Sequence, residues 1–388
     1  MQQKGNKKAL LTIFLITLLA VMGVASLTPA FPTIARHFGL DMGEIGLLIT
    51  AFTIPGIFMA PLMGILADRL GRKAVLIPSL ILFGLAGAAC AFTDDFNLLL
   101  LFRVFQGLGA ASLGSLNITL IGDLFEGNRR AAVMGYNASV LSVGTASYPA
   151  IGGALTLIDW KLIFYLPFLA IPVAILALLT LQTQKPKNGQ NVKAYFKSLW
   201  RIVNQRYVWA LFAMNILVFI ILYGAFLTFL PSFLETHFQT DSFEIGVIMS
   251  AMSLTTAITA TQLGNIAKRI AKKQIMSIAT LAYIVAFTSL AFSSNIMLVV
   301  IAVIFYGLGQ GLFIPTIQTM LAGIASVNER GSIMSINSMV LRIGQSLGPV
   351  VMALFFINET YIWVFLAAAA MAIILFVINL LFIRMNNK

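Results

Sequence analysis

Long apolar stretches recur along the whole chain, and they constrain its fold more than any other feature. Of the 388 residues, 60% are hydrophobic and only 10% are charged, against about 45–50% and about 25% in soluble globular proteins. One helical crossing of a bilayer takes about 20 apolar residues, and a helix satisfies its backbone hydrogen bonds internally. The sequence therefore predicts an all-α integral membrane protein with twelve transmembrane helices, at residues 9–34, 45–67, 74–93, 96–122, 131–157, 161–182, 207–234, 243–267, 273–293, 295–324, 331–357 and 360–383.

The charges between these spans alternate in sign from one loop to the next. Twelve crossings place both termini on one side, and the loops on that side carry 21 Lys and Arg residues against four acids. The opposite loops carry two basic residues against nine acids. Positively charged loops face the cytoplasm, so we expect a multi-pass protein of the cell membrane with both termini cytoplasmic. The net charge of +12 is scattered over short loops without a basic domain, which indicates topology and no nucleic-acid partner.

The two halves of the sequence repeat each other at an offset of 200 residues. Residues 37–51 and 237–251 share seven of fifteen residues, and residues 128–149 and 328–349 share eight of twenty-two. The repeat predicts two parallel six-helix bundles related by a two-fold axis along the membrane normal, with a central cavity whose access alternates as the halves rock. We expect an N-terminal bundle, a cytoplasmic linker and a C-terminal bundle at residues 1–182, 183–206 and 207–388.

The loop after the second span reads G-I-L-A-D-R-L-G-R-K. This pattern resembles the signature of the major facilitator superfamily, which implies the transporter fold of that family and a gating role for Gly64, Asp68, Arg69, Gly71, Arg72 and Lys73. We expect Asp68 to lie opposite the positive N-terminus of the eleventh span, near Gly331 and Ser332, and to hold the cytoplasmic side shut. In the alternative interpretation Asp68 ends a helix, and the basic residues only set the topology.

A second motif places an arginine within the fourth span, in L-L-L-F-R-V-F-Q-G-L-G-A-A at residues 99–111. A charge inside a membrane span marks a pathway by default, and the resemblance implies that Arg103 takes part in proton transfer. A cation bonded to backbone carbonyls at a helix crossing is the alternative. Asp123, in the loop that follows, is a second candidate for proton coupling. With Arg130 it is expected to join Asp68 and Arg72 in a cytoplasmic charge network.

The fifth span contains G-T-A-S-Y-P-A-I-G-G, which is similar to the motif of the family's drug:proton antiporters, although Tyr148 replaces one glycine. Proline bends a helix, and glycine lets a neighbouring helix come close. The eleventh span carries G-Q-S-L-G-P at the equivalent position. The kinked-helix residues are Gly144, Pro149, Gly152, Gly153, Gly348 and Pro349.

Several other polar residues fall within spans and are candidates for lining a substrate cavity. Arg342 would favour an anionic group if it faces the cavity, whereas an arginine that snorkels to the inner leaflet would not. No Asp or Glu falls in the middle of a predicted span. The candidates are Asn117, Asn137, Asn215, Tyr223, Gln310, Gln318, Asn337 and Arg342.

These features favour a secondary transporter of the twelve-span drug:proton antiporter branch, which exports small amphipathic compounds in exchange for protons. A proton-linked carrier of one metabolite, such as a sugar, amino acid or nucleoside, is the alternative. A non-transporting receptor is a third hypothesis. With one cysteine and two histidines, the chain offers no multi-cysteine metal site. We expect no enzymatic activity, cofactor or metal, and a monomer whose partners are its substrate, protons and the bilayer.

Overall fold

The computed structural model describes residues 2–181, 205–324 and 330–383, and this part of the chain is built from helices without a strand. The first half comprises α1 Gln2–Ala25, η1 Thr28–Ala30, α2 Phe31–Phe38, α3 Met42–Ile45, α4 Leu47–Leu70, α5 Arg72–Ala89, η2 Cys90–Phe92, α6 Phe96–Leu124, α7 Gly127–Ile158, η3 Trp160–Leu169 and α8 Ala170–Thr180. The second half comprises α10 Arg206–Ile220, the π-helix η4 Ile221–Phe229, α11 Leu230–Phe238, α12 Ser242–Ile266, α13 Lys272–Ala291, α14 Ile296–Ile324, α15 Arg330–Ala353, η5 Ile357–Glu359 and α16 Tyr361–Phe382.

Eleven helical segments in the described residues are long and apolar enough to cross a membrane. They correspond to eleven of the twelve predicted spans. The remaining span, 331–357, corresponds to α15, which has 24 residues but a more polar sequence. It packs against α4 and α10 inside the molecule, where its polar residues are shielded from lipid. The all-helical membrane fold is therefore confirmed.

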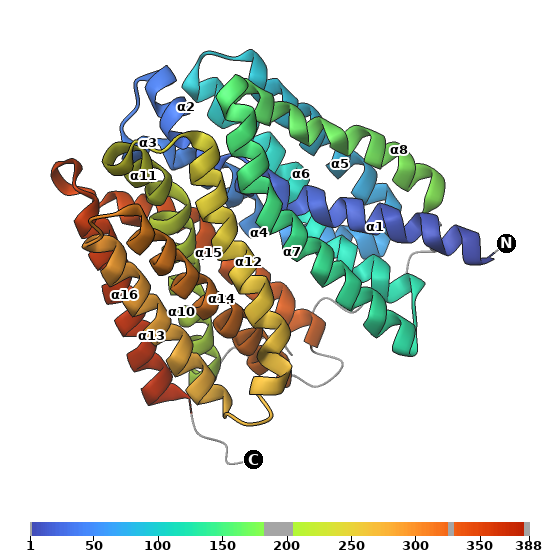
Figure 1. Ribbon diagram of the computed structural model, residues 1–388. Coiled ribbons are helices and arrows are strands. Elements are labelled where there is room, and N and C mark those ends of the chain that lie inside the picture. Colours follow the sequence, from blue (N-terminus) through green and yellow to red (C-terminus); the bar gives the residue numbers. More distant parts are fainter. Residues whose placement is uncertain (1, 182–204, 325–329, 384–388) are drawn as a thin grey trace.

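The helices form two bundles with the same internal packing (Figure 1). Buried apolar side chains divide into one cluster from residues 9–181 and another from residues 208–383. In the first bundle α1 packs against α7, α4 and α5 pack against α6, and α5 packs against α8. The second repeats these contacts with α10 and α15, α12 and α13 with α14, and α13 with α16. The repeat of contacts follows the repeat in sequence. The predicted linker, 183–206, falls almost entirely outside the described residues.

The two bundles meet through α7 with α12 and α4 with α15. We call the end of the molecule formed by residues 39–46, 93–96, 159–160 and 239–241 the acidic end, and the opposite end, with residues 68–73, 123–130 and 268–273, the basic end. At the acidic end several close approaches between the bundles occur at glycines. A Cβ on Gly153 would overlap the Ser242 carbonyl, one on Gly246 would overlap the Pro149 carbonyl, and one on Gly46 would lie 2.6 Å from Pro349. These glycines therefore let the bundles close there.

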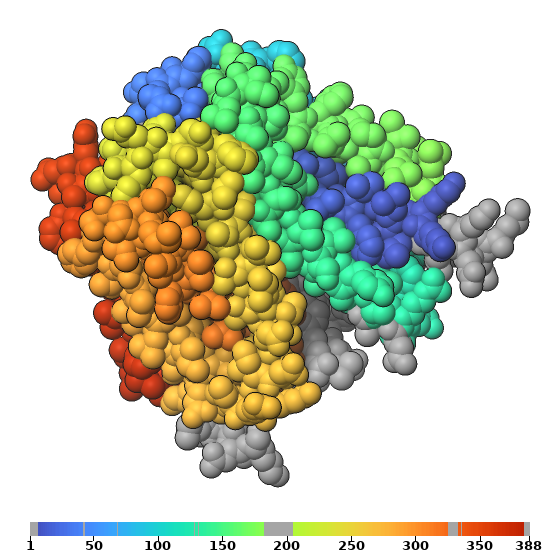
Figure 2. All heavy atoms as spheres, viewed as in Figure 1, coloured from blue at the N-terminus to red at the C-terminus, as the bar shows by residue number. Residues whose placement is uncertain are grey.

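The hydrogen bonds and ion pairs between the bundles, among the described residues, also lie toward the acidic end. Thr50 Oγ1 donates to the Ser346 carbonyl over 3.0 Å, and the hydroxyls of Thr53 and Ser346 lie 2.8 Å apart. Arg36 pairs with Glu235 at 2.5 Å. Figure 2 shows the bundles in contact at the acidic end and separated toward the basic end. The structure is therefore closed at the acidic end.

We predict that Gly153→Val opens the acidic end, because the added side chain collides with the backbone of α12 at Ser242. Spin labels at the exposed positions Asn97 and Ser294, one on each bundle, report the separation in a Cys90→Ala background. The distance distribution should shift to longer values than in the parent protein.

Gly135→Val is the matched control, because it adds the same side chain to the same helix. A Cβ at Gly135 meets no described atom within 4 Å, and the change in helix propensity is the same. The distance in this variant should stay at the parent value. An equal shift in both variants would contradict the close contact as the cause.

Candidate functional site

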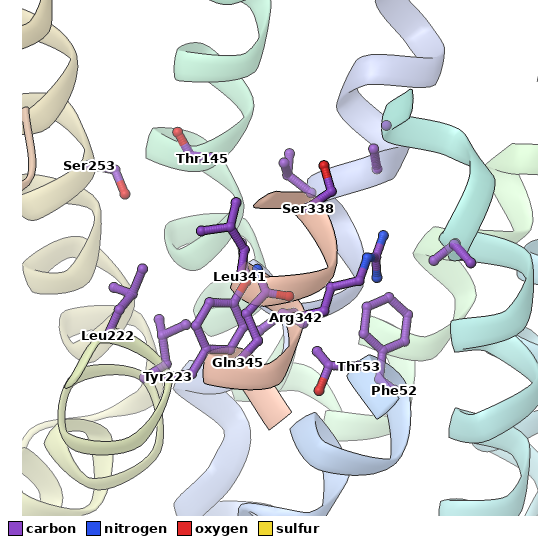
Figure 3. A pocket seen from close by; sticks show the side chains of 18 of the residues that line it. Phe52, Thr53, Thr145, Leu222, Tyr223, Ser253, Ser338, Leu341, Arg342 and Gln345 are labelled. Atoms are coloured by element: carbon purple, nitrogen blue, oxygen red, sulfur yellow. The ribbon is translucent and has the colours of Figure 1, made fainter. Parts of the chain in front are cut away.

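A cavity of about 410 Å³ lies between the two bundles. Its volume falls within the range of about 300–1,000 Å³ that is usual for small-molecule sites. The first bundle contributes α1, α4, α6 and α7, and the second contributes η4, α12 and α15 (Figure 3). The lining residues are Ala20, Val21, Val24, Ala25, Phe52, Thr53, Ala60, Ala110, Ala111, Gly114, Ser115, Ile118, Thr145, Pro149, Leu222, Tyr223, Phe226, Leu227, Met249, Met252, Ser253, Ser338, Leu341, Arg342 and Gln345.

Most of this lining is apolar, and Arg342 is its single charged residue in the described part of the chain. No carboxylate lines the cavity among the described residues. On α15 the lining residues are Ser338, Leu341, Arg342 and Gln345, a spacing that places them on one face of the helix. Ser338 and Gln345 share this helical face with Arg342, and that spacing is a signal in the sequence by which they could be identified. No such pattern in the sequence marks the hydroxyls of Thr53 and Ser253.

Arg342 reaches from the second bundle to the first. A Cβ on Gly56 of α4 would lie on the Arg342 guanidinium, so the absence of a side chain at that position makes room for the charge. In Figure 3 the side chain points from α15 toward Phe52. Of the eight predicted cavity candidates, the structure places Arg342 and Tyr223 in the lining.

Arg103 lies behind the cavity wall, with 1% of its surface exposed. Its Nε donates to the Leu48 carbonyl over 3.1 Å, and its Nη2 donates to the Gly23 carbonyl over 2.9 Å. Its Nη1 donates to Gln106 over 2.6 Å. The guanidinium also lies over the ring of Phe52, 4.5 Å from its centroid. Arg103 therefore ties α1, α4 and α6 together, and Phe52 separates it from the cavity.

Four of the predicted polar residues form hydrogen bonds inside the bundles rather than line the cavity. Asn117 and Asn137 both contact Thr17, and Asn117 donates to Asn137 over 3.3 Å. In the second bundle Asn215 donates to Asn337 over 2.7 Å. Asn137 and Asn337 are equivalent in the repeat, so each bundle has a polar tie between its first and fifth spans.

The two glutamine candidates belong to α14 and are also absent from the described lining. Gln310 is buried and donates to the Tyr306 hydroxyl over 2.7 Å. Gln318 is half-buried. A polar residue within a span must satisfy its hydrogen bonds, which it does by pairing inside a bundle or by facing a cavity. The sequence pattern alone does not distinguish these two outcomes.

The kinked-helix residues lie at close helix contacts. Pro149 lines the cavity, and a Cβ on Gly152 would overlap the Ser26 carbonyl. A Cβ on Gly144 would lie 2.9 Å from Leu18, and one on Gly348 would lie 2.9 Å from the Gly224 amide. These residues therefore set how closely the cavity-forming helices approach.

The motif loop lies at the basic end. Gly71 separates α4 from α5 with φ 96° and ψ 147°, a conformation that favours glycine. Arg72 Nε lies 3.3 Å from Asp123 Oδ2, and both side chains are largely buried. This pair belongs to the predicted charge network. The side chains of Asp68 and Ser332 are outside what the structure describes, so the predicted latch stays a prediction.

The other motif residues differ in their surroundings. Lys73 donates to the carbonyls of Leu178 and Leu181 at the end of α8, and its equivalent Lys273 donates to the Leu380 carbonyl near the end of α16. Cations are favourable at the C-terminus of a helix, so these lysines cap the sixth and twelfth spans. Arg69 is exposed, and Gly64 has room for a Cβ.

A separate ionic cluster lies at the acidic end. Asp94 accepts from Lys161 over 2.7 Å and lies 3.2 Å from His37 Nε2. The hydrogen bond from Lys161, followed by that from His37, holds the pKa of Asp94 below its usual value. Asp41 and Asp241, which follow the two histidines, cap α3 and α12. This cluster is remote from the cavity lining.

The chain belongs to the Major Facilitator Superfamily, whose model matches residues 13–239 and again 212–388. The bacillibactin exporter of Bacillus subtilis (strain 168) is 25% identical over 96% of this chain and 95% of that protein. Multidrug resistance protein 1 of the same organism is 26% identical over 90% of each. A bacterial homologue of the human lysosomal transporter Spinster, in an inward-facing and unoccupied conformation, has a TM-score of 0.83 at 18% identity and 97% coverage of each chain. The predicted family and transporter fold are confirmed.

We predict that Arg103→Leu destabilises the protein, because it removes hydrogen bonds that join three helices. A hydrogen bond to a charged group contributes about 1.5–3 kcal/mol, so the loss should be on the order of several kcal/mol. It should appear as a lower melting temperature of the purified protein in detergent. Arg103→Lys should recover only part of the lost stability, because an ammonium lacks the planar fork that reaches two carbonyls.

Arg206→Leu is the control, because it removes an exposed arginine at the start of α10. Its melting temperature should equal that of the native protein. If Arg103→Leu melts as the native protein does, the hydrogen bonds of Arg103 do not stabilise the bundle.

Proposed function

We propose that this protein exports small amphipathic compounds across the cell membrane by alternating access, in exchange for protons. The observation that carries the proposal is the largely apolar cavity between two equivalent bundles that are closed at one end. Such a cavity takes a compound with an apolar body and one or a few polar groups. The relatives named as an exporter and a multidrug resistance protein support outward transport.

The direction of transport depends on the orientation of the chain. The excess of Lys and Arg in the loops of the basic end supports a cytoplasmic location for that end and for both termini. The conformation closed at the acidic end is then the one that receives its substrate from the cytoplasmic side. Residues 1–182 and 207–388 are the two rocking units in this proposal, joined by a cytoplasmic linker at 183–206 in a monomer.

Proton coupling is proposed to act through Asp123 at the basic end. Asp123 and Arg103 are twenty residues apart on the continuous helix α6, which is about 30 Å at 1.5 Å per residue. A proton therefore does not pass directly between them. Protonation of Asp123 would instead weaken its attraction to Arg72, release the start of α5 from the end of α6, and loosen the motif loop that contains Asp68. Arg103 keeps the bundle rigid during this change.

We predict that vesicles containing the purified protein, with an imposed proton gradient, accumulate amphipathic dyes, and that a protonophore abolishes this uptake. Asp123→Asn should reduce gradient-driven flux at least about tenfold, because a neutral amide cannot take up the proton or keep the full attraction to Arg72. Asp68→Asn should also reduce flux. The measurement is the initial rate of dye uptake.

Glu126→Gln is the matched control, because Glu126 is an exposed acid three residues after Asp123. This variant should transport at the native rate. Export that continues at the native rate in Asp123→Asn, or without any proton gradient, would contradict the proposed coupling. Absence of flux for every compound would contradict the proposed export itself.

A further inference from the structure

We infer that the substrates of this cavity carry an anionic group, which binds to Arg342 while the apolar body of the compound lies against the apolar lining. The inference rests on the proposed function and names the substrate class. It follows from the distribution of charge, of hydrogen-bond donors and of apolar surface around the cavity.

The charge in the lining is positive. Arg342 lines the cavity and has no hydrogen-bond or ion-pair acceptor among the described residues. A guanidinium within a membrane protein is costly unless it pairs with an anion or faces water. Arg103 adds a second positive charge behind Phe52, and the described lining contains no carboxylate to balance either of them. The cavity therefore attracts an anion and repels a cation.

The donors that remain available lie on the second bundle. In the first bundle the lining hydroxyls already have acceptors: Thr53 donates to Ile49 over 2.9 Å, Ser115 to Ser112 over 3.2 Å, and Thr145 to Ser142 over 3.0 Å. In the second bundle the lining residues without a described hydrogen-bond partner are Tyr223, Ser253, Arg342 and Gln345.

These donors come from neighbouring elements of the second bundle. Figure 3 shows Tyr223 and Gln345 beside α15, and the Arg342 side chain reaching away from them toward Phe52. Arg342 and Gln345 are three residues apart on one face of α15, and Tyr223 comes from the adjacent π-helix η4. A carboxylate accepts up to four hydrogen bonds, so an anionic group bound to Arg342 can still accept from other donors. An ammonium group would find few acceptors here.

Apolar surface lines both sides of the cavity, and the second bundle contributes Leu222, Phe226 and Met249 among others. The first bundle contributes small and aromatic apolar side chains from α1, α4 and α6, among them Val21, Val24, Phe52 and Ile118. A compound with an anionic group at one end and an apolar body at the other therefore has a preferred orientation. The repeat partner of Arg342 is Ser142, so this polarity comes from a position at which the two bundles differ.

The test compares matched ligands in nanodiscs of phosphatidylcholine, which carries no net charge. The ligands are aromatic carboxylates such as 1-naphthaleneacetate, their primary amides and the corresponding amines. Equilibrium binding should rank carboxylate above amide and amide above amine. Arg342→Gln should weaken carboxylate binding at least about tenfold, because a charge-assisted hydrogen bond is lost, and leave the amide within about twofold. Arg342→Lys should preserve the ranking.

Arg206→Gln, which removes an exposed arginine, is the control and should bind all three ligands as the native protein does. An anionic lipid has the same recognition chemistry, so phosphatidylglycerol is added to a parallel set of nanodiscs. Competition by this lipid in the native protein, but not in Arg342→Gln, would support the anion site and identify the bilayer as a source of its ligand.

The inference is overturned if the native protein shows no preference for carboxylates, whether or not other ligands bind, or if Arg342→Gln retains the preference. These outcomes are separate from a failure of export. Carboxylate preference without flux in vesicles overturns the proposed export and leaves the anion site. Flux of neutral and cationic dyes without carboxylate preference overturns the anion site and leaves the export.

Discussion

The structure depends on one constraint, which is that hydrocarbon offers no partner for a polar group. The buried polar side chains of the spans meet it mainly by pairing within one bundle. Arg103 does so with two backbone carbonyls and Gln106, and Asn215 does so with Asn337. Arg342 differs from Arg103, because its guanidinium has no such acceptor among the described residues and faces the cavity. The same physical rule thus separates residues that hold the bundles together from the residue most suited to bind a ligand.

The repeat divides the residues in a second way. Positions at which both halves carry the same residue have structural roles: Lys73 and Lys273 cap helices, and Gly46 and Gly246 lie at the contacts between the bundles. Positions at which the halves differ create the polarity of the cavity. Arg342 corresponds to Ser142. Two identical halves would form a symmetric cavity, whereas Arg342 gives this one a charge on one side only.

The sequence predicts the fold more completely than it predicts the site. Span positions follow from hydropathy, which is a local property, and α6 at Phe96–Leu124 lies close to the predicted 96–122. The breaks near Pro29 and at η4 were absent from the prediction, because hydropathy does not distinguish a continuous helix from one that is kinked or widened.

Site residues depend on which way a helix is rotated about its axis, and hydropathy in a span shows this only weakly. Asn137 and Arg342 are both polar residues in kinked helices, yet one lies in a bundle and the other in the cavity wall. Gly56 had no motif to identify it. Its importance appears only when α15 is placed opposite α4, because the guanidinium of Arg342 then occupies the place of the missing side chain.

In the proposed alternating access the closed acidic end has to separate, and its contacts are suited to that. Thr53 Oγ1 contacts Ser346 across the interface, but it also lies 2.9 Å from the Ile49 carbonyl of its own helix. When the bundles part, the hydroxyl keeps this acceptor, so no buried donor is left unpaired. Arg36 and Glu235 lie near the surface, with side chains 60% and 28% exposed, and such a pair contributes only about 0–1 kcal/mol because water solvates both partners. The glycine contacts bury little side-chain surface. The acidic end is therefore held by many small contacts that are individually cheap to break.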